Sequence, residues 1–216
     1  ELIADVRRIV DDGLDESIPP GSGNDNLHMR AVVMDSRAHL ALNTGDASSA
    51  TSLYHKALDL REELRRRDSR SMVYQHNLAV SHDNLGDCHL LAARAPGISP
   101  ERASECLKLA EAEYRESIEI SRVLVARPDA GNLWKHDLAV GLFKLGDTLA
   151  NRDDEDLRMK ATEVLVEGKT VAEGLAESDP DYPKWQAHLG LFCLRLGRIH
   201  ALGAQDEEAR RYFTRG

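Results

Sequence analysis

The sequence repeats itself, and this repetition constrains the fold more than any other feature. Three segments of equal length align without a gap, and each begins with an aromatic residue and carries a Leu-Gly pair near its end: Tyr74–Asp87, Trp134–Asp147 and Trp185–Arg198. Each is followed by a small residue with a bulky one four positions later, at Ala110/Tyr114, Ala161/Leu165 and Ala209/Phe213. A weaker copy upstream has Ala38 in place of the Gly, then Ala50 and Tyr54. Repetition of this kind along a sequence is typical of repeat folds.

Between these landmarks the apolar residues follow a helical period. Leu138, Leu142, Leu145 and Leu149, for example, recur at steps of three and four, and no stretch alternates with period two. The seven prolines fall in short clusters that separate the helical stretches. The pattern predicts an all-α fold.

The spacing of the copies locates an insertion. From the equivalent residues Ala31, Ala79, Ala139 and Gly190, the repeats measure 48, 60 and 51 residues, and all the excess lies between the two helices of a repeat. A 48-residue unit gives two helices of about 20 residues, roughly 30 Å each. The largest insertion falls at about residues 93–104, where Ser99 is predicted to cap the next helix and Pro100 to begin it.

These motifs resemble the tetratricopeptide repeat, whose pattern is W-x2-L-G-x2-Y, then A-x3-F, then P. The resemblance covers about residues 26–216. The family's Trp is absent from its usual place, where Met34, His82, Leu142 and Cys193 stand, and an aromatic residue lies eight positions upstream in the three stronger copies. The resemblance implies a right-handed superhelical solenoid of antiparallel helix pairs, in which Gly or Ala in the first helix lets the second approach closely.

The predicted organisation is four repeats with an incomplete one in front. The segments are 1–18 (the end of a second helix), 19–26 (a linker), 27–70, 71–129 with the insertion, 130–181, and 182–216 with a shortened second helix. Because Gly13-Leu14 matches Gly174-Leu175, and because the last second helix is short, we expect the chain to be a piece of a longer array.

In solenoids of this kind the first helices line a concave surface, and in the tetratricopeptide family that surface binds peptides. Projecting each first helix at steps of four and three gives one stripe per repeat. The candidate groove residues are Asp35, His39, His76, Asp83, Asn84, Asp87, His136, Phe143, Lys144, Asp147, Arg195 and Arg198. They predict an acidic groove with a basic end, suited to a partner with positive charge toward the middle repeats and a negative group near Arg195 and Arg198. Alternatively, Asp and Arg residues of adjacent repeats pair with each other and stabilise the array.

Three histidines, His28, His76 and His136, occupy equivalent positions. A histidine and the residue seven positions later are about 10.5 Å apart, too far to share a metal ion. Histidines of adjacent helices remain a possible metal or pH-sensing pair, against an ordinary role in interhelical hydrogen bonding. The basic run Arg65–Arg67, with Arg61 and Arg70, is interpreted as the end of a second helix, where cations offset the helix dipole, with an anion site as the alternative.

Composition excludes several classes of function. A net charge of −9 is the wrong sign for a broad nucleic-acid surface, and no apolar run is long enough to cross a membrane. The three cysteines are scattered, which favours a reducing, cytoplasmic location over a disulfide framework or cysteine zinc site. No HExxH, GxSxG or glycine-rich phosphate loop is present, and Cys88-His89 are mere sequence neighbours, so we expect no enzyme activity and no cofactor.

The sequence therefore favours a non-catalytic module that binds a protein or peptide. Two alternatives stay open. One is a sensor or regulatory domain attached to a missing signalling enzyme. The other is a receptor for a peptide or small ligand, which predicts an enclosed apolar pocket near Phe143, Leu191 and Leu194.

Overall fold

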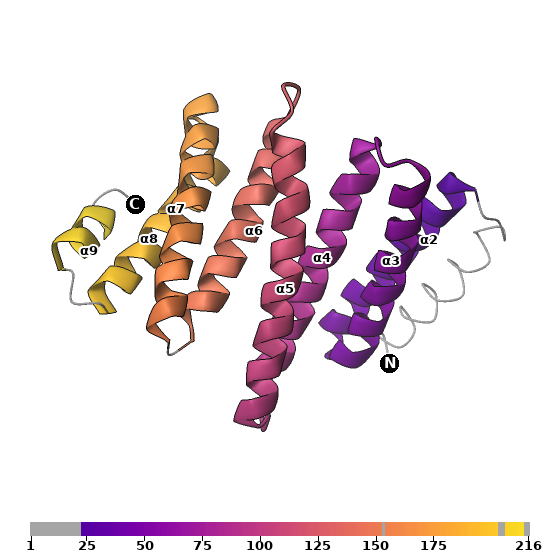
Figure 1. Ribbon diagram of the computed structural model, residues 1–216, viewed down its shortest axis with the longest axis horizontal. Coiled ribbons are helices and arrows are strands. Elements are labelled where there is room, and N and C mark those ends of the chain that lie inside the picture. The colour runs from indigo at the N-terminus through magenta and orange to yellow at the C-terminus, as the bar shows by residue number, and fades with distance from the viewer. Residues whose placement is uncertain (1–22, 153, 203–205, 214–216) are drawn as a thin grey trace. The chain divides into compact units, whose positions relative to one another are not determined.

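The computed structural model describes residues 23–152, 154–202 and 206–213. Within these ranges every regular element is an α-helix and no strand occurs, which confirms the predicted all-α class. The helices are α2 (Asn24–Asn43), α3 (Ala47–Arg67), α4 (Met72–Ala93), α5 (Pro100–Val125), α6 (Asn132–Ala150), α7 (Glu155–Ser178), α8 (Pro183–Leu202) and α9 (Asp206–Phe213) (Figure 1). The predicted helix end at residues 1–18 lies outside the described residues, as does most of the predicted linker.

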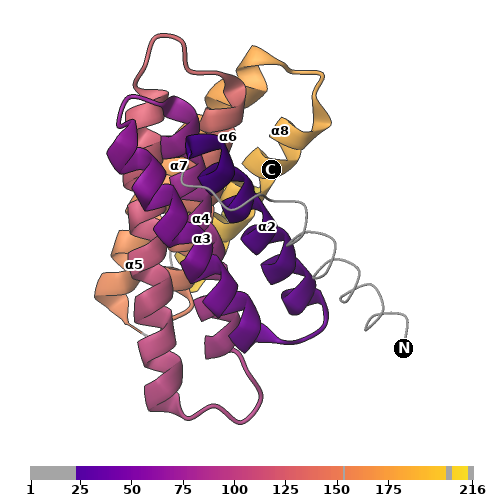
Figure 2. The same ribbon diagram turned by 90° about the vertical axis from the view of Figure 1, so that its right-hand side faces the viewer.

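The chain divides into two compact units, Glu1–Glu113 and Tyr114–Gly216, and the division falls within α5. In the first unit α3 packs against α2 and α4, and both views show α2 and α3 side by side (Figure 2). In the second unit α7 packs against α6 and α8, and α8 packs against α9. Consecutive helices therefore pack on one another within each unit.

Short polar side chains fix where the helices begin. The side chains of Asp46, Ser71, Ser99 and Asp154 each accept a hydrogen bond from the backbone N–H three residues later, at the starts of α3, α4, α5 and α7. These bonds satisfy N–H groups that have no partner inside the helix. The predicted cap at Ser99 is confirmed, with Pro100 as the first residue of α5. Gly45 turns the chain between α2 and α3 at φ 81°, a conformation that glycine adopts at little cost.

The core of the first unit is built from small residues of one helix facing bulky residues of the next. Ala38 and Ala41 of α2, Ala50 and Tyr54 of α3, and Leu85 and Cys88 of α4 form one buried cluster. Tyr54 is 1% exposed and Ala50 is fully buried, so this small-and-bulky pair is in the core as its repeat position predicts. The cluster joins all three helices.

Close packing of the helices in the second unit depends on glycines at the helix contacts. A Cβ on Gly146 of α6 would lie 2.5 Å from Cγ of Leu165 in α7, and both Leu165 and Ala161 are fully buried. The Gly of the Leu-Gly pair therefore admits the bulky residue of the second helix, as expected. Gly168 of α7 likewise leaves room for the ring of Phe192 in α8.

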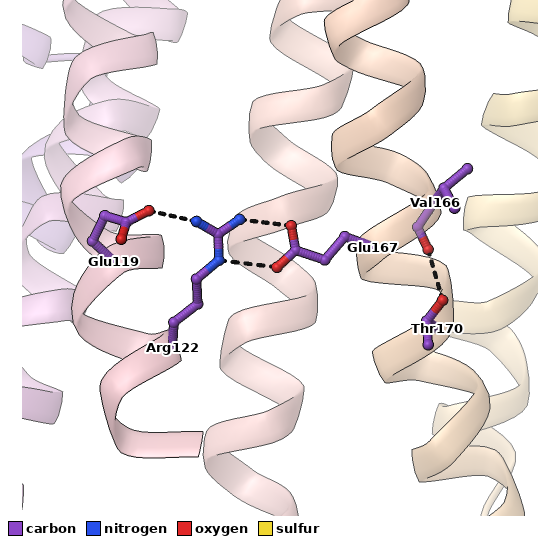
Figure 3. A network of polar contacts seen from close by, with 5 residues as sticks. All are labelled: Glu119, Arg122, Val166, Glu167 and Thr170. Atoms are coloured by element: carbon purple, nitrogen blue, oxygen red, sulfur yellow. Dashed lines mark hydrogen bonds and ion pairs between the residues drawn. The ribbon is translucent and has the colours of Figure 1, made fainter. Parts of the chain in front are cut away.

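An ion pair links α5 and α7 in this unit. Arg122 near the end of α5 donates two hydrogen bonds to the carboxylate of Glu167 in α7, at 2.9 and 2.6 Å, and a third to Glu119 (Figure 3). Beside it the Thr170 hydroxyl donates to the Val166 carbonyl at 3.0 Å. Because Arg122 and Glu167 are each about 40% exposed, we expect a modest stabilisation from the pair.

None of the described helices combines the length and apolar character needed to span a membrane.

Candidate functional site

Asp35, a predicted groove acid on α2, is bound to a buried arginine. The guanidinium of Arg61 in α3 donates to the Asp35 carboxylate and to the hydroxyl of Ser81 in α4. The Arg61 side chain is 4% exposed and that of Asp35 is 15% exposed. Arg61 therefore joins three helices, and its guanidinium compensates the charge of the Asp35 carboxylate within the unit.

Sequence reasoning assigned Arg61 to a basic helix end and missed its place in the core, although a signal for that place exists. The buried positions of α3 are Ala50, Tyr54, Ala57, Arg61 and Leu64, which follow steps of four and three. Arg61 thus occupies a core position of the second helix. A charged residue in such a stripe is expected to have a partner on a neighbouring helix, because an unpaired buried charge is costly.

His39 is also tied to the core of the first unit. Its exposed ring shares a hydrogen bond of 3.0 Å between Nδ1 and the hydroxyl of Tyr54. Burial of Tyr54, with nearby Cys88, Asp35 and Asp87, raises the pKa of its hydroxyl well above the ordinary value. The tyrosine is therefore neutral at physiological pH, where its hydroxyl can donate to His39.

The remaining groove candidates of the first unit lie on α4. His76, Asp83, Asn84 and Asp87 are all half-buried there. His82, which sequence reasoning did not select, lies on the same helix and forms an ion pair of 2.7 Å with Glu113 of α5. Helix α4 thus carries carboxylate, amide and imidazole groups at partial exposure.

In the second unit, predicted site residues of α6 are contacted by α8. The rings of His136 and His188 stack with centroids 4.7 Å apart, and Phe143 meets Phe192 edge-on at 5.3 Å. The Nε of Arg195 lies 2.9 Å from Oδ1 of Asp147, and Arg195 also donates to Asn151 at 2.8 Å. Asp147 and Arg195 therefore pair between adjacent repeats, as the alternative interpretation predicted.

Lys144, another predicted groove residue of α6, lies over the ring of Tyr114 with its Nζ 5.9 Å from the centroid. This distance is within range of a cation–π interaction. Lys144 is half-buried. Its ammonium group therefore already interacts with Tyr114 within the unit.

The geometry of the His136–His188 pair disfavours a metal ion shared between the two rings. The planes of His136 and His188 differ by only 21°, so the in-plane lone pairs of two stacked rings do not converge on one point. Nδ1 of His136 lies 3.3 Å from the Asp137 carboxylate. Burial, followed by the neighbouring His136 and Lys184, lowers the pKa of His188. In the described ranges no group of three or more His, Cys, Asp or Glu residues is placed to hold a metal.

The predicted first-helix stripe is exposed to solvent on α8. Ala187, Leu191, Leu194, Arg198 and Ala201 are all exposed, with Leu191 at 46% and Leu194 at 43%. The opposite side of the helix, including Phe192 and Leu196, is buried. Among the residues that the structure describes, the Arg198 side chain forms no ion pair or hydrogen bond. An apolar strip with an available cation therefore faces outward from α8.

The first unit also contains a cleft that sequence reasoning did not anticipate. It has a volume of about 850 Å³ between α3, α4 and α5, and His55, Lys56, His89, Arg102 and Cys106 are among its lining residues. The rings of His55 and His89 are 6.4 Å apart, and burial lowers the pKa of His89. Exposed charges of both signs line the walls, including Asp59 and Glu105.

The Cys88-His89 pair is not arranged as a nucleophile and base. Cys88 is buried in the core of the first unit, and burial raises the pKa of its thiol. A raised pKa keeps the sulfur protonated, whereas nucleophilic catalysis needs the thiolate.

Comparison with models of protein families finds none that matches the chain. A search of curated proteins likewise finds no similar sequence.

Proposed function

We propose that the chain is a non-catalytic protein-interaction module, a tetratricopeptide-like solenoid of right-handed superhelical form whose first helices bind a segment of a partner protein. The exposed stripe of α8 is the observation that carries this proposal. Contiguous exposed apolar surface rimmed by polar residues marks interaction sites in proteins. Burying the remaining surface of Leu191 and Leu194 would contribute about 1 kcal/mol each to binding.

The charged residues of the proposed surface indicate which charge the partner should carry. The predicted groove acids Asp35 and Asp147 are compensated by Arg61 and Arg195. Arg198 is the basic group that a partner carboxylate would meet. The proposed partner is therefore apolar and acidic where it crosses α8.

A receptor with an enclosed pocket is less well supported. Such a pocket would bury Leu191 and Leu194, whereas both side chains are more than 40% exposed. A regulatory domain attached to a signalling enzyme uses the same protein-binding surface and remains compatible with the proposal. Three free cysteines, Cys88, Cys106 and Cys193, support the proposed cytoplasmic location, because thiols persist in reducing compartments.

Photo-crosslinking tests the proposal. A benzophenone amino acid replaces Leu194 in one variant and Val166, which is 42% exposed on α7, in a matched control. We expect a discrete protein adduct in an extract of the source cells from position 194 and none from position 166, with excess unlabelled protein competing the adduct away. Identical adducts from both positions, or none from position 194, would contradict the proposal.

A further inference from the structure

The contact between α6 and α8 has a regular pattern. Residues of α8 at positions i, i+4 and i+7 (His188, Phe192 and Arg195) meet His136, Phe143 and Asp147 of α6. The three contacts are a ring stack, an edge-on aromatic pair and an ion pair. One face of α6 is thus contacted by α8, which presents aromatic rings at the first two positions and a positive charge at the third.

Because the sequence repeats, α8 has a face equivalent to this face of α6. The residues of α8 equivalent to His136, Phe143 and Asp147 lie 51 positions later, and they are Ala187, Leu194 and Arg198. All three are exposed, and no described helix covers them. The equivalent face of α8 is therefore present without its helix, and its charge is reversed because arginine replaces the aspartate.

We propose that this face of α8 binds a partner α-helix with apolar side chains at positions i and i+4 and a carboxylate at position i+7, which pairs with Arg198. This inference rests on the proposed function and names the chemistry of its partner. Apolar residues spaced four and three apart form a straight seam along a helix, and another helix packs along such a seam. Ala187 and Arg198 are about 16 Å apart along α8, and positions i to i+7 span two turns, about 10 Å, of the partner helix.

A second copy of the chain does not supply such a helix through its first repeat. The residues of α2 equivalent to His188, Phe192 and Arg195 are Met29, Val33 and Ser36. Val33 is only 4% exposed, and Ser36 carries no charge for Arg198. The face is therefore suited to a different, acidic helix.

Two synthetic helical peptides test the proposal. Both are fluorescently labelled, alanine-rich and of 20 residues, with Phe at i and Leu at i+4; one has Glu and the other Lys at i+7. By fluorescence anisotropy at low salt, we expect the Glu peptide to bind the full chain at least fivefold more tightly than the Lys peptide. Arg198→Glu should reverse this order, and Leu191→Asp with Leu194→Asp should abolish binding of both. Lys160→Glu, an equal change of charge on α7, should leave the order unchanged.

The outcomes separate this inference from the broader function. Absence of binding by the Glu peptide would overturn it. Equal binding of both peptides, unaffected by Arg198→Glu, would also overturn the carboxylate pairing. Neither result removes the proposed function, which fails if position 194 gives no specific crosslink to a protein. Circular dichroism of each variant confirms that it is folded, so that lost binding reports the surface.

Discussion

Replacing Gly146 by alanine tests the packing that the repeat pattern predicts. The new Cβ would lie 2.5 Å from Cγ and 2.7 Å from Cδ2 of Leu165, a fully buried side chain. Overpacking of this kind costs about 1–3 kcal/mol, whereas alanine in place of glycine inside a helix contributes about 1 kcal/mol. Because the contact is far shorter than carbon atoms tolerate, we expect the steric cost to exceed the gain and the free energy of unfolding to fall by about 1 kcal/mol.

Gly174 of α7 is the matched control. A Cβ there has no neighbour within 4 Å, so Gly174→Ala should raise the free energy of unfolding by about 0.5–1 kcal/mol. Urea denaturation followed by circular dichroism measures both variants. Leu165→Ala should also cost less in the Gly146→Ala background than alone, because the smaller side chain relieves the clash. The reasoning is refuted if Gly146→Ala stabilises the protein as much as Gly174→Ala does.

Three further predictions concern polar groups. Arg61→Met should lower the free energy of unfolding by about 3 kcal/mol because it leaves the Asp35 carboxylate buried and unpaired, while adding Asp35→Leu should restore much of the loss; no recovery in urea denaturation would count against the pair. Because the pKa of His188 is lowered by burial, the unfolded chain binds the proton more readily, so stability is complete above about pH 6.5 and falls at lower pH. His188→Phe should weaken this dependence in thermal melts from pH 7.5 to 5, and an unchanged slope would refute the assignment. A double-mutant cycle of Arg122→Ala and Glu167→Ala should give a coupling of about 0.5–1 kcal/mol that shrinks in 1 M NaCl; a salt-independent value would contradict it.

The helices and their close contacts could be predicted because they depend on repeated local patterns. The repeat pattern predicted that a second helix approaches closely at Gly146, and the structure shows that Leu165 of the small-and-bulky pair is the side chain it meets. The start of α5 followed from Ser99-Pro100 alone. Such features need only the helical period and the size of a side chain.

The polar partners could not be predicted in the same way. Asp35 was assigned to the groove because it lies on the first-helix stripe, but its partner Arg61 belongs to the core stripe of the next helix. His188 stands one position beyond Ala187, the residue equivalent to His136, so alignment of the repeats did not reveal the stack. Pairing of this kind depends on how far and in which direction a long side chain reaches across a helix contact.

The most direct test of the central claim is the affinity of the partner captured through position 194 for the wild-type chain and for the Leu191→Asp, Leu194→Asp variant. We expect the variant to stay folded by circular dichroism and to bind at least tenfold more weakly, since both changes lie on an exposed face. Val166→Asp should bind like the wild type. Equal affinity of the wild type and the leucine variant would contradict the claim that this face of α8 binds protein.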